Sequence, residues 1–474
     1  MADMKQELLR GLPSIGTLLA TETAQAWCQH HPKGLVTECL RQAVEEIRRQ
    51  ILEDTGGRCG PAHVTEAFVL KAAGLLLEER AAAHIRRAIN ATGIILHTGL
   101  GRSVFPERVV DSIIEELKSY VTLAVDRATG TRSERHLRIE YVVTELTGAE
   151  SATVVNNNAA ATLLVLAALA AGREVIVSRG QLIEIGGSFR LPEVMSQSGA
   201  RLVEVGTTNR THLRDYAAAI TDNTAAILRV HPSNYRVVGF TSQPELAELV
   251  ELGKSRGVLV LDDLGAGALV GLERFGLPHE PTIAESIAAG ADVVLASTDK
   301  LIGGPQGGLI AGRRAHLERI RRHPLARAMR ADKTCLMILE RTLHLFRDVD
   351  LLAREHPLYR ALATPPAALE ARARSLAEAI RAAAPCVNAE VRPDFGYLGS
   401  GSLPMEKLPT FVVALTPSGD TKPAALARLL RTDEACIFSR IEDEQVILDA
   451  RTIEDKDLSL IAQAMGRICE GKAE

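Results

Sequence analysis

Short runs of β-branched and apolar residues alternate with helical stretches between about residue 150 and residue 312. Each run is the length of one strand, and the runs lie at residues 152–155, 174–177, 201–205, 225–230, 258–261, 292–295 and 308–311. Strands that alternate with helices form right-handed crossovers, which produce a largely parallel sheet with helices on both faces. The sequence therefore predicts an α/β fold, in which ligands bind beyond the carboxyl ends of the strands.

Helices are predicted before this alternating region, and a smaller mixed unit is predicted after it. Apolar residues recur at three- and four-residue spacings within residues 1–82, which indicates a helical N-terminal domain. Residues 83–364 are predicted to form the large domain together with a linker, and residues 365–474 a small α+β C-terminal domain. Three domains agree with a chain of 474 residues, at roughly 100–200 residues per domain.

The composition excludes several classes of protein. Hydrophobic residues make up 46% of the chain and charged residues 24%, which is typical of globular proteins and excludes disorder. The seven cysteines are scattered without a C-x-x-C pair, which argues against a zinc site and against a secreted disulfide framework. The longest apolar run, at residues 159–171, is shorter than the roughly 20 residues of a bilayer span. Because no signal peptide is visible either, the sequence predicts a cytoplasmic protein.

Polar residues follow three of the predicted strands, where an α/β sheet binds its ligands. Asn157 and Asn158 begin an apolar helix whose N-terminus suits a phosphate, and plain N-capping by Asn158 is the alternative. Asp263 follows the fifth run and suits a carboxylate facing a cofactor, a metal ligand or a helix cap. Lys300 lies in a glycine-rich loop after the sixth run. A partly buried lysine there acts as a Schiff-base amine or a base, and an exposed loop lysine is the alternative.

The order of these residues is more specific than any one of them. Fold-type-I enzymes that use pyridoxal 5'-phosphate (PLP) have the same order of residues on a parallel sheet. A phosphate-binding segment comes first, then an aspartate at a strand end, then a lysine at a strand end. In those enzymes the aspartate pairs with the protonated pyridine nitrogen and the lysine binds PLP covalently. The combination predicts a PLP-dependent enzyme without a metal site.

Longer motifs extend over nearly the whole chain. They include Ile89-Asn90-Ala91-Thr92-Gly93, Ser233-Asn234-Tyr235, Asp299-Lys300 with Gly303-Gly304-Pro305-Gln306, and residues 12–15, 156–161, 205–212, 327–333 and 399–404. These motifs resemble those of the bacterial selenocysteine synthases, the L-seryl-tRNA(Sec) selenium transferases. The resemblance implies a fold-type-I PLP-dependent transferase whose helical N-terminal domain binds tRNA. It also implies a homo-oligomer, a decamer built from dimers. The net charge of −4 gives no independent sign of an RNA partner.

The resemblance also implies a role for each candidate residue around the cofactor. Lys300 would hold PLP, and Asp263 would pair with the pyridine nitrogen. Asn157, Asn158 and Ser297 would lie near the phosphate.

The implied reaction converts seryl-tRNA(Sec) to selenocysteinyl-tRNA(Sec) through an aminoacrylyl intermediate, with selenophosphate as the selenium donor. Arg102, Arg327 and Arg330 occupy the positions of family arginines around this anion, and guanidinium groups suit phosphate-like oxygens. The alternative for such an arginine-rich segment is a solvated helix face.

A PLP-dependent paralogue with a different substrate is the alternative function. It would catalyse β-elimination, β-replacement or ammonia loss on a small amino acid. The alternative stays open because residues near the expected site differ from the family pattern, namely Gly99, Ser133, Ala266, Ala268 and Thr298.

Overall fold

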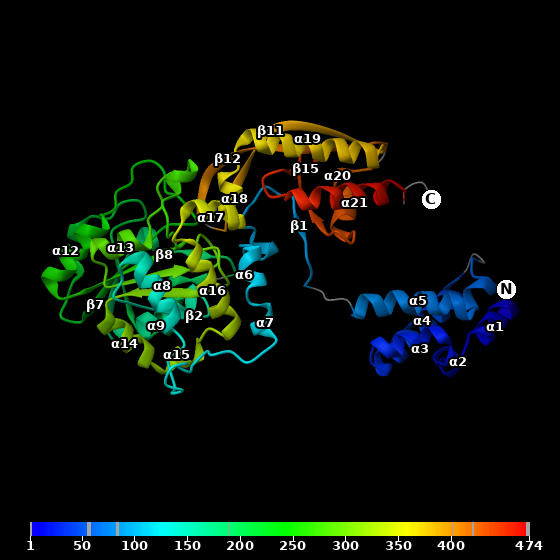
Figure 1. Cartoon of the computed structure of the whole chain (residues 1–474), viewed down its shortest axis with the longest axis horizontal. Helices are drawn as coiled ribbons and strands as arrows, with labels where there is room; N and C mark the ends of the chain where they lie inside the picture. The colour runs from blue at the N-terminus through cyan, green and yellow to red at the C-terminus, as the bar shows by residue number, and fades with distance from the viewer. Residues whose placement is uncertain are drawn as a thin grey trace. The chain divides into compact units, whose positions relative to one another are not determined.

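The structure of the protein is a computed structural model that describes residues 2–54, 58–81, 85–187, 189–400, 402–419 and 421–470. The chain divides into two compact units, Met1–Arg87 and Ala88–Glu474, which are described separately below (Figure 1). No helix in these described ranges is both long enough and apolar enough to cross a membrane.

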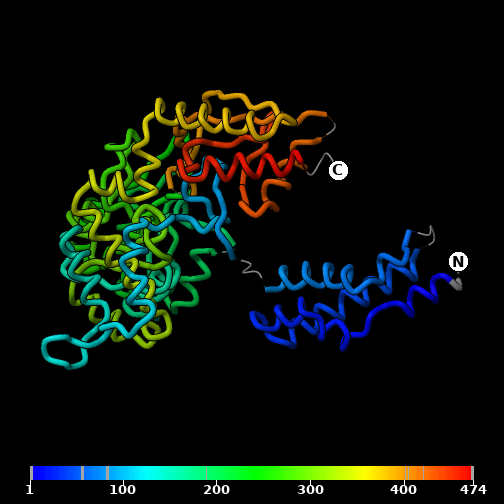
Figure 2. Tube along the Cα trace, turned by 45° about the vertical axis from the view of Figure 1, so that its right-hand side comes forward, coloured from blue at the N-terminus to red at the C-terminus, as the bar shows by residue number. Residues whose placement is uncertain are grey.

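The first unit is helical, as the apolar spacings predict. Its helices are α1 (Ala2–Gly11), α2 (Ile15–Ala20), α3 (Glu22–His30), α4 (Lys33–Glu53), the 3₁₀ helix η1 (Pro61–Val64) and α5 (Glu66–Ala81). Side-chain caps start three of them, since Ser14 accepts from the Thr17 N–H, Thr21 from the Ala24 N–H and Thr65 from the Phe68 N–H. The long helices α4 and α5 lie side by side (Figure 2) and share an apolar core that includes Leu40 and Val69.

A seven-stranded sheet forms the centre of the second unit. Its strands are β2 (Ser151–Val155), β3 (Glu174–Ser178), β6 (Arg201–Val205), β7 (Thr224–Val230), β8 (Leu259–Gly265), β9 (Val293–Ser297) and β10 (Gly308–Gly312), in the order β2-β10-β9-β8-β7-β3-β6. The prediction of a largely parallel sheet is confirmed, and only β10 runs against the others. Residues 298–307 join β9 to β10, and such a connection is too short for the crossover of a parallel pair.

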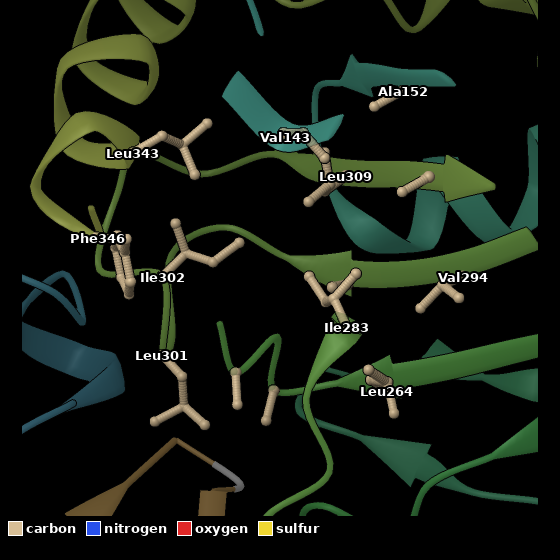
Figure 3. Close-up of a cluster of buried hydrophobic side chains, with 14 of the residues drawn as sticks. Val143, Ala152, Leu264, Ile283, Val294, Leu301, Ile302, Leu309, Leu343 and Phe346 are labelled. Atoms are coloured by element: carbon tan, nitrogen blue, oxygen red, sulfur yellow. The ribbon is translucent and has the colours of Figure 1, made fainter. Parts of the chain in front are cut away.

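Helices cover both faces of this sheet. Successive residues of a strand point to opposite faces, so each buried strand presents apolar side chains to the helices on both sides. In β9, Val293 and Leu295 pack into one hydrophobic cluster, while Val294 and Ala296 pack into another, part of which Figure 3 shows. The first cluster contains residues of α9 (Asn158–Ala170), α10 (Leu191–Gln197) and α14 (Arg314–Arg322). The second contains residues of α8 (Leu137–Thr147), α12 (Leu246–Arg256), α13 (Ile283–Ala289) and α16 (Lys333–Leu345).

Shorter elements complete this region. They are η2 (Thr98–Leu100), α6 (Glu107–Asp111), α7 (Ile114–Leu117), η3 (Arg179–Gln181), β4 (Glu184–Ile185), β5 (Phe189–Arg190), α11 (Leu213–Ala219), η4 (Leu272–Phe275), α15 (Pro324–Ala328), α17 (Val349–Glu355) and α18 (Pro357–Ala363).

The C-terminal elements pack around a second sheet and a core of their own. An antiparallel sheet has the order β11-β12-β15-β14, with β11 (Val387–Gly399), β12 (Ser402–Pro417), β14 (Arg440–Glu442) and β15 (Gln445–Asp449). The helices are α19 (Pro366–Ala383), α20 (Pro423–Thr432), η5 (Asp455–Asp457) and α21 (Leu458–Glu470). The strand β1 (Ile89–Asn90) pairs in parallel with β13 (Ile437–Phe438), so Ile89 and Ala91 are buried in this same core.

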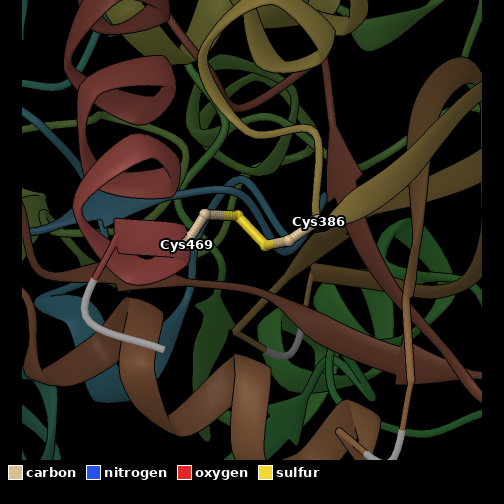
Figure 4. Close-up of a disulfide and its surroundings, with 2 residues drawn as sticks. All are labelled: Cys386 and Cys469. Carbon is tan, nitrogen blue, oxygen red and sulfur yellow. A yellow bond between two sulfur atoms is a disulfide. The ribbon is translucent and has the colours of Figure 1, made fainter. Parts of the chain in front are cut away.

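One disulfide ties the two ends of this C-terminal region together (Figure 4). It joins Cys386, just before β11, to Cys469 in α21, over a sequence separation of 83 residues. The sequence analysis argues against a secreted disulfide framework, and it does not predict this single pair. The reason is that only the packing of α21 beside the start of β11 brings the two thiols together. The other five cysteines are free thiols.

We expect the disulfide to stabilise the C-terminal region. A cross-link over a loop of this length contributes about 2–4 kcal/mol to the free energy of unfolding. Denatured, unreduced protein should therefore expose five reactive thiols, and reduction should expose all seven and lower the melting temperature. Cys386→Ser should melt like the reduced protein, whereas Cys28→Ser, which changes a free thiol, should keep the response to reductant. Seven thiols before reduction would contradict the pairing.

Candidate active site

Asp263 lies near the end of β8 and is buried. Its Oδ1 accepts hydrogen bonds from Asn158 Nδ2 at 2.9 Å and from the Gly265 N–H at 3.1 Å, and its Oδ2 accepts one from Thr162 Oγ1 at 3.1 Å. Burial raises the pKa of Asp263, and these hydrogen bonds and the charge of Lys300 partly oppose the rise. A cation bound beside this carboxylate would stabilise its charged form.

Lys300 lies in the loop between β9 and β10 and is also buried, so the alternative of an exposed loop lysine is wrong. Burial lowers the pKa of the Lys300 amine. The negative charges of Asp299 and Asp263 raise this pKa, and the positive charge of Arg102 lowers it. Besides burial, only charges shift this pKa, and no hydrogen bond to the amine is found among the described residues. A lysine with a lowered pKa has a larger neutral fraction and is therefore a better nucleophile and base.

Arg102 lies beside the lysine because it forms an ion pair with Asp299, the residue that precedes Lys300. The turn that presents it has positive φ angles at Gly101 (92°) and at Arg102 itself (65°), and the Arg102 N–H donates to the His97 carbonyl at 2.9 Å. A non-glycine residue in this region of φ is uncommon, and five other residues of the described chain share it. The structure thus brings Arg102 to the Lys300 site.

The expected phosphate seat lies at the same end of the sheet. Asn157 is the N-cap of α9, and its Oδ1 accepts from the Ala160 N–H at 2.8 Å. The N-cap is therefore Asn157 and not Asn158, the residue named in the capping alternative. Ser297 ends β9 directly opposite Gly308, and a Cβ added at Gly308 would lie 2.2 Å from the Asn157 carbonyl oxygen. Ser297 and the start of α9 are therefore close neighbours across a single glycine.

These side chains fit PLP. A buried carboxylate would meet the protonated ring nitrogen, and an amine without a hydrogen-bond partner is available to bind the aldehyde. Asn158 already donates its amide N–H to Asp263, and its Oδ1 is buried with no hydrogen-bond partner in the described residues. The observed contact of Asn158 is thus with the aspartate.

Arg327 and Arg330 lie in a different place, in and just after α15. Both line a cavity of about 760 Å³ together with Arg132 and Arg135, which precede α8, and with residues of α8 and α14. Burial lowers the pKa of Arg135, and the positive charges of Arg330, Arg327 and Arg132 lower it further. An anion in this cavity would relieve that repulsion. Neither Arg102 nor Lys300 is among the lining residues, so within one chain the three predicted arginines do not form one cluster.

A second cavity, of about 490 Å³, lies at the carboxyl end of β7. His231 follows β7 directly, and its Nε2 lies 3.2 Å from an oxygen of Glu280, a carboxylate whose charge also raises the pKa of Lys300. Leu403 and Glu406 of β12 also line this cavity. The sequence analysis did not single out His231 or Glu280, although the position of His231 directly after a predicted strand was a usable signal.

The buried lysine and aspartate at the carboxyl ends of a mostly parallel sheet define a fold-type-I PLP-dependent transferase fold. A solved structure of D-glucosaminate-6-phosphate ammonia-lyase shares this fold, with a TM-score of 0.55 and 20% identity over 84% of this chain and 99% of that chain. The predicted fold class is confirmed.

The chain belongs to the L-seryl-tRNA selenium transferase family, whose family model matches residues 88–454. A second model, selenocysteine synthase N terminal, matches residues 9–48. The L-seryl-tRNA(Sec) selenium transferase of Alkaliphilus metalliredigens is 42% identical over 466 residues, which cover 98% of this chain and 100% of the relative. That of Methylocella silvestris is 44% identical over 451 residues, covering 94% and 95%. The resemblance deduced from the motifs is confirmed.

Proposed function

We propose that the protein converts seryl-tRNA(Sec) to selenocysteinyl-tRNA(Sec), with PLP as its cofactor and selenophosphate as the selenium donor. The observation that carries this proposal is the buried pair of Lys300 and Asp263, in a chain that matches named selenium transferases over almost its full length. We further propose that the protein acts as a homo-oligomer, a decamer built from dimers.

Five residues are proposed to hold the cofactor. Lys300 would bind PLP covalently, Asp263 would pair with its ring nitrogen, and Asn157 and Ser297 would contact its phosphate. Asn158 orients Asp263 through the hydrogen bond described above. When bound, PLP stabilises negative charge at the α-carbon of an amino acid.

The chain's own side chains would then move protons at the seryl group. The neutral amine of Lys300 takes the α-proton, and the β-hydroxyl leaves as water, which gives the aminoacrylyl group on the tRNA. Asp299 and Arg102 keep opposite charges beside that amine, so that a proton can be gained or lost there without leaving a buried charge unpaired. The selenium of selenophosphate would then bond to the β-carbon, Lys300 would return a proton to the α-carbon, and water would cleave the P–Se bond to release phosphate.

Three of the five departures from the family pattern lie in the interior of the protein. Ala266 and Ala268 are buried in the hydrophobic cluster that contains Val294, and the Ala266 carbonyl accepts from the Leu301 N–H at 3.1 Å. Thr298 is fully buried, and its hydroxyl donates to the Pro305 carbonyl. These three side chains therefore pack within the protein, whereas Ser133 lines the 760 Å³ cavity together with Arg327.

The test is to incubate the full-length protein and PLP with seryl-tRNA(Sec) and selenophosphate, and to identify the amino acid released from the tRNA. We expect selenocysteine with both substrates, and an aminoacrylyl product when the donor is omitted. Free serine and other small amino acids serve as the comparison. Turnover of a free amino acid to a keto acid and ammonia, with none of seryl-tRNA(Sec), would favour the paralogue.

We expect Arg327→Ala to impair selenium transfer more than aminoacrylyl formation. The arginine is proposed to bind the anionic donor in the 760 Å³ cavity, and losing one charge-assisted hydrogen bond lowers a rate by about 10- to 100-fold. The two steps are measured separately, with and without selenophosphate. Arg319→Ala is the matched control, because Arg319 lies in the same arginine-rich segment but donates to the Ala168 carbonyl outside the cavity lining. Equal loss of both steps in Arg327→Ala would contradict donor binding.

Removal of residues 1–87 is expected to weaken seryl-tRNA(Sec) binding by at least about 100-fold, or nearly 3 kcal/mol. The remaining residues form a separate compact unit with its own cores, so they should still bind PLP. Binding is measured by filter retention or fluorescence anisotropy at fixed low salt, since protein–RNA affinity depends strongly on ionic strength. Unchanged tRNA affinity in the truncated protein would contradict the assignment of the helical domain to tRNA.

A further inference from the structure

The junction of α17 and α18 lies against the loop that carries Lys300. His356 is fully buried at this junction, and its Nδ1 accepts from the Leu358 N–H at 3.2 Å. Because Nδ1 is an acceptor, the hydrogen of the neutral ring is on Nε2, which lies 3.2 Å from the Gly303 carbonyl oxygen and donates to it. Burial lowers the pKa of His356 to about 4, so the ring is neutral at physiological pH.

A second side chain of α18 contacts the same loop two residues earlier. Tyr359 is fully buried, and its hydroxyl donates to the Leu301 carbonyl oxygen at 2.6 Å. Its ring is enclosed by Phe275, Phe346 and His356, with centroid distances of 5.3, 5.6 and 5.5 Å. Figure 3 shows Phe346 within the cluster that also buries Leu301. The phenol is therefore fixed by packing as well as by its hydrogen bond.

The two carbonyls belong to the first and third residues after Lys300. Gly303 has a φ of +71°, its N–H donates to the Lys300 carbonyl at 2.9 Å, and a Cβ there would lie 2.1 Å from Nε2 of His356. No helix or strand ladder includes these residues, so the side chains of α18 supply partners that regular secondary structure does not.

The helix α18 is itself anchored on its other side. Arg360 forms an ion pair with Glu454 at 2.5 Å, and Arg451 donates to the Ala361 carbonyl at 2.6 Å. Both partners belong to the C-terminal elements. A helix that is held from that side can fix the backbone of the Lys300 loop in one place.

We propose that His356 and Tyr359 are positioning residues that hold the backbone after Lys300, so that its amine is presented to the Asp263 site. This inference rests on the proposed function of Lys300. Neither side chain is proposed to touch the cofactor or the substrate.

The experiment compares four variants in cofactor-free protein. Tyr359→Phe removes only the hydroxyl. His356→Asn keeps an acceptor at the position of Nδ1 but no donor to Gly303, whereas His356→Gln places an amide N–H at the position of Nε2. Tyr216→Phe is the matched control, because Tyr216 of α11 is another fully buried tyrosine in the same hydrophobic cluster, and its hydroxyl has no hydrogen-bond partner among the described residues.

The first readout is hydrogen–deuterium exchange of a peptide spanning residues 298–307. We expect Tyr359→Phe and His356→Asn each to speed this exchange by about tenfold, the effect of losing one net hydrogen bond. His356→Gln and Tyr216→Phe should exchange like the wild type. The second readout is the rate at which added PLP is captured by Lys300, fixed with borohydride and located by mass spectrometry, which should fall in the same two variants.

Unchanged exchange and capture in both Tyr359→Phe and His356→Asn would overturn the inference, as would an equal change in Tyr216→Phe. If His356→Gln differs from the wild type in hydrogen–deuterium exchange or in PLP capture, the hydrogen bond from His356 to the Gly303 carbonyl is not what holds the loop. Wild-type protein that never captures PLP would contradict the proposed function instead, and the exchange data would still decide whether the loop is held by α18.

Discussion

Lys300→Ala is expected to abolish the covalent capture of PLP and to lower the rate of selenocysteinyl-tRNA formation by at least about 10³-fold. The alanine removes the amine that is proposed both to bind the cofactor and to take the α-proton. The measurement is the visible absorption of bound PLP, together with single-turnover product formation. Lys300→Ala breaks no hydrogen bond of the described residues, and comparing its melting temperature with that of the wild type separates a loss of chemistry from a loss of folding.

A second variant of Lys300 separates the chemistry of the amine from its charge, and a lysine elsewhere serves as the control. Lys300→Arg keeps a positive charge beside Asp263, but a guanidinium does not lose its proton in proteins and cannot act as the nucleophile. It should be as inactive as Lys300→Ala. Lys254→Ala changes a lysine in the last turn of α12 and should be fully active. Normal PLP capture by Lys300→Ala would show that a different lysine holds the cofactor.

The strands and the two central site residues could be predicted from sequence for a simple physical reason. Buried strands of a parallel sheet are short, continuous apolar runs, so the predicted runs coincide with β2, β3, β6, β7, β8, β9 and β10 to within a few residues. A polar residue placed directly after such a run lies at the ligand-binding edge. Asp263 and Lys300 stand out for this reason alone.

Contacts between distant segments could not be predicted in the same way. The hydrogen bond from Asn158 to Asp263 depends on the distance between the start of α9 and β8, across two intervening strands. The sequence therefore places Asn158 near a phosphate, whereas its observed partner is the aspartate. The Cys386–Cys469 disulfide likewise depends on the packing of α21.

The resemblance predicted that three arginines lie around one site, and within this chain they do not form one cluster. Arg102 is close to Lys300 because Asp299 pairs with it, and no local pattern in the sequence reveals that pair. Arg327 and Arg330 share motif positions with the same expected site but line a separate cavity in this chain. His356 and Tyr359 carry no sequence signal at all, because a buried histidine and tyrosine on a helix read as ordinary core residues.

Asp263→Asn is expected to lower the rate of aminoacrylyl formation by about 10²–10³-fold while Lys300 still captures PLP. The amide has the shape of the carboxylate and keeps one oxygen for Asn158 or Thr162, but it has no charge to keep the ring nitrogen protonated. The cofactor would then stabilise the α-carbon charge poorly. Asp263→Ala should be less stable as well, by about 1–3 kcal/mol, because it leaves buried donors without their acceptor.

The neighbouring acid provides the matched control for this prediction. Asp262 is fully buried, and it pairs with Arg229 at 2.9 Å and accepts from Ser286 at 2.7 Å, away from the Lys300 site. Asp262→Asn should lower the melting temperature, because it leaves a largely buried guanidinium without its counter-charge, but it should keep the turnover of the folded protein. We thus expect Asp263→Asn to lose turnover and Asp262→Asn to lose stability, although the two residues are adjacent. Full turnover by Asp263→Asn would remove the proposed pairing with the cofactor ring, whatever happens at Asp262.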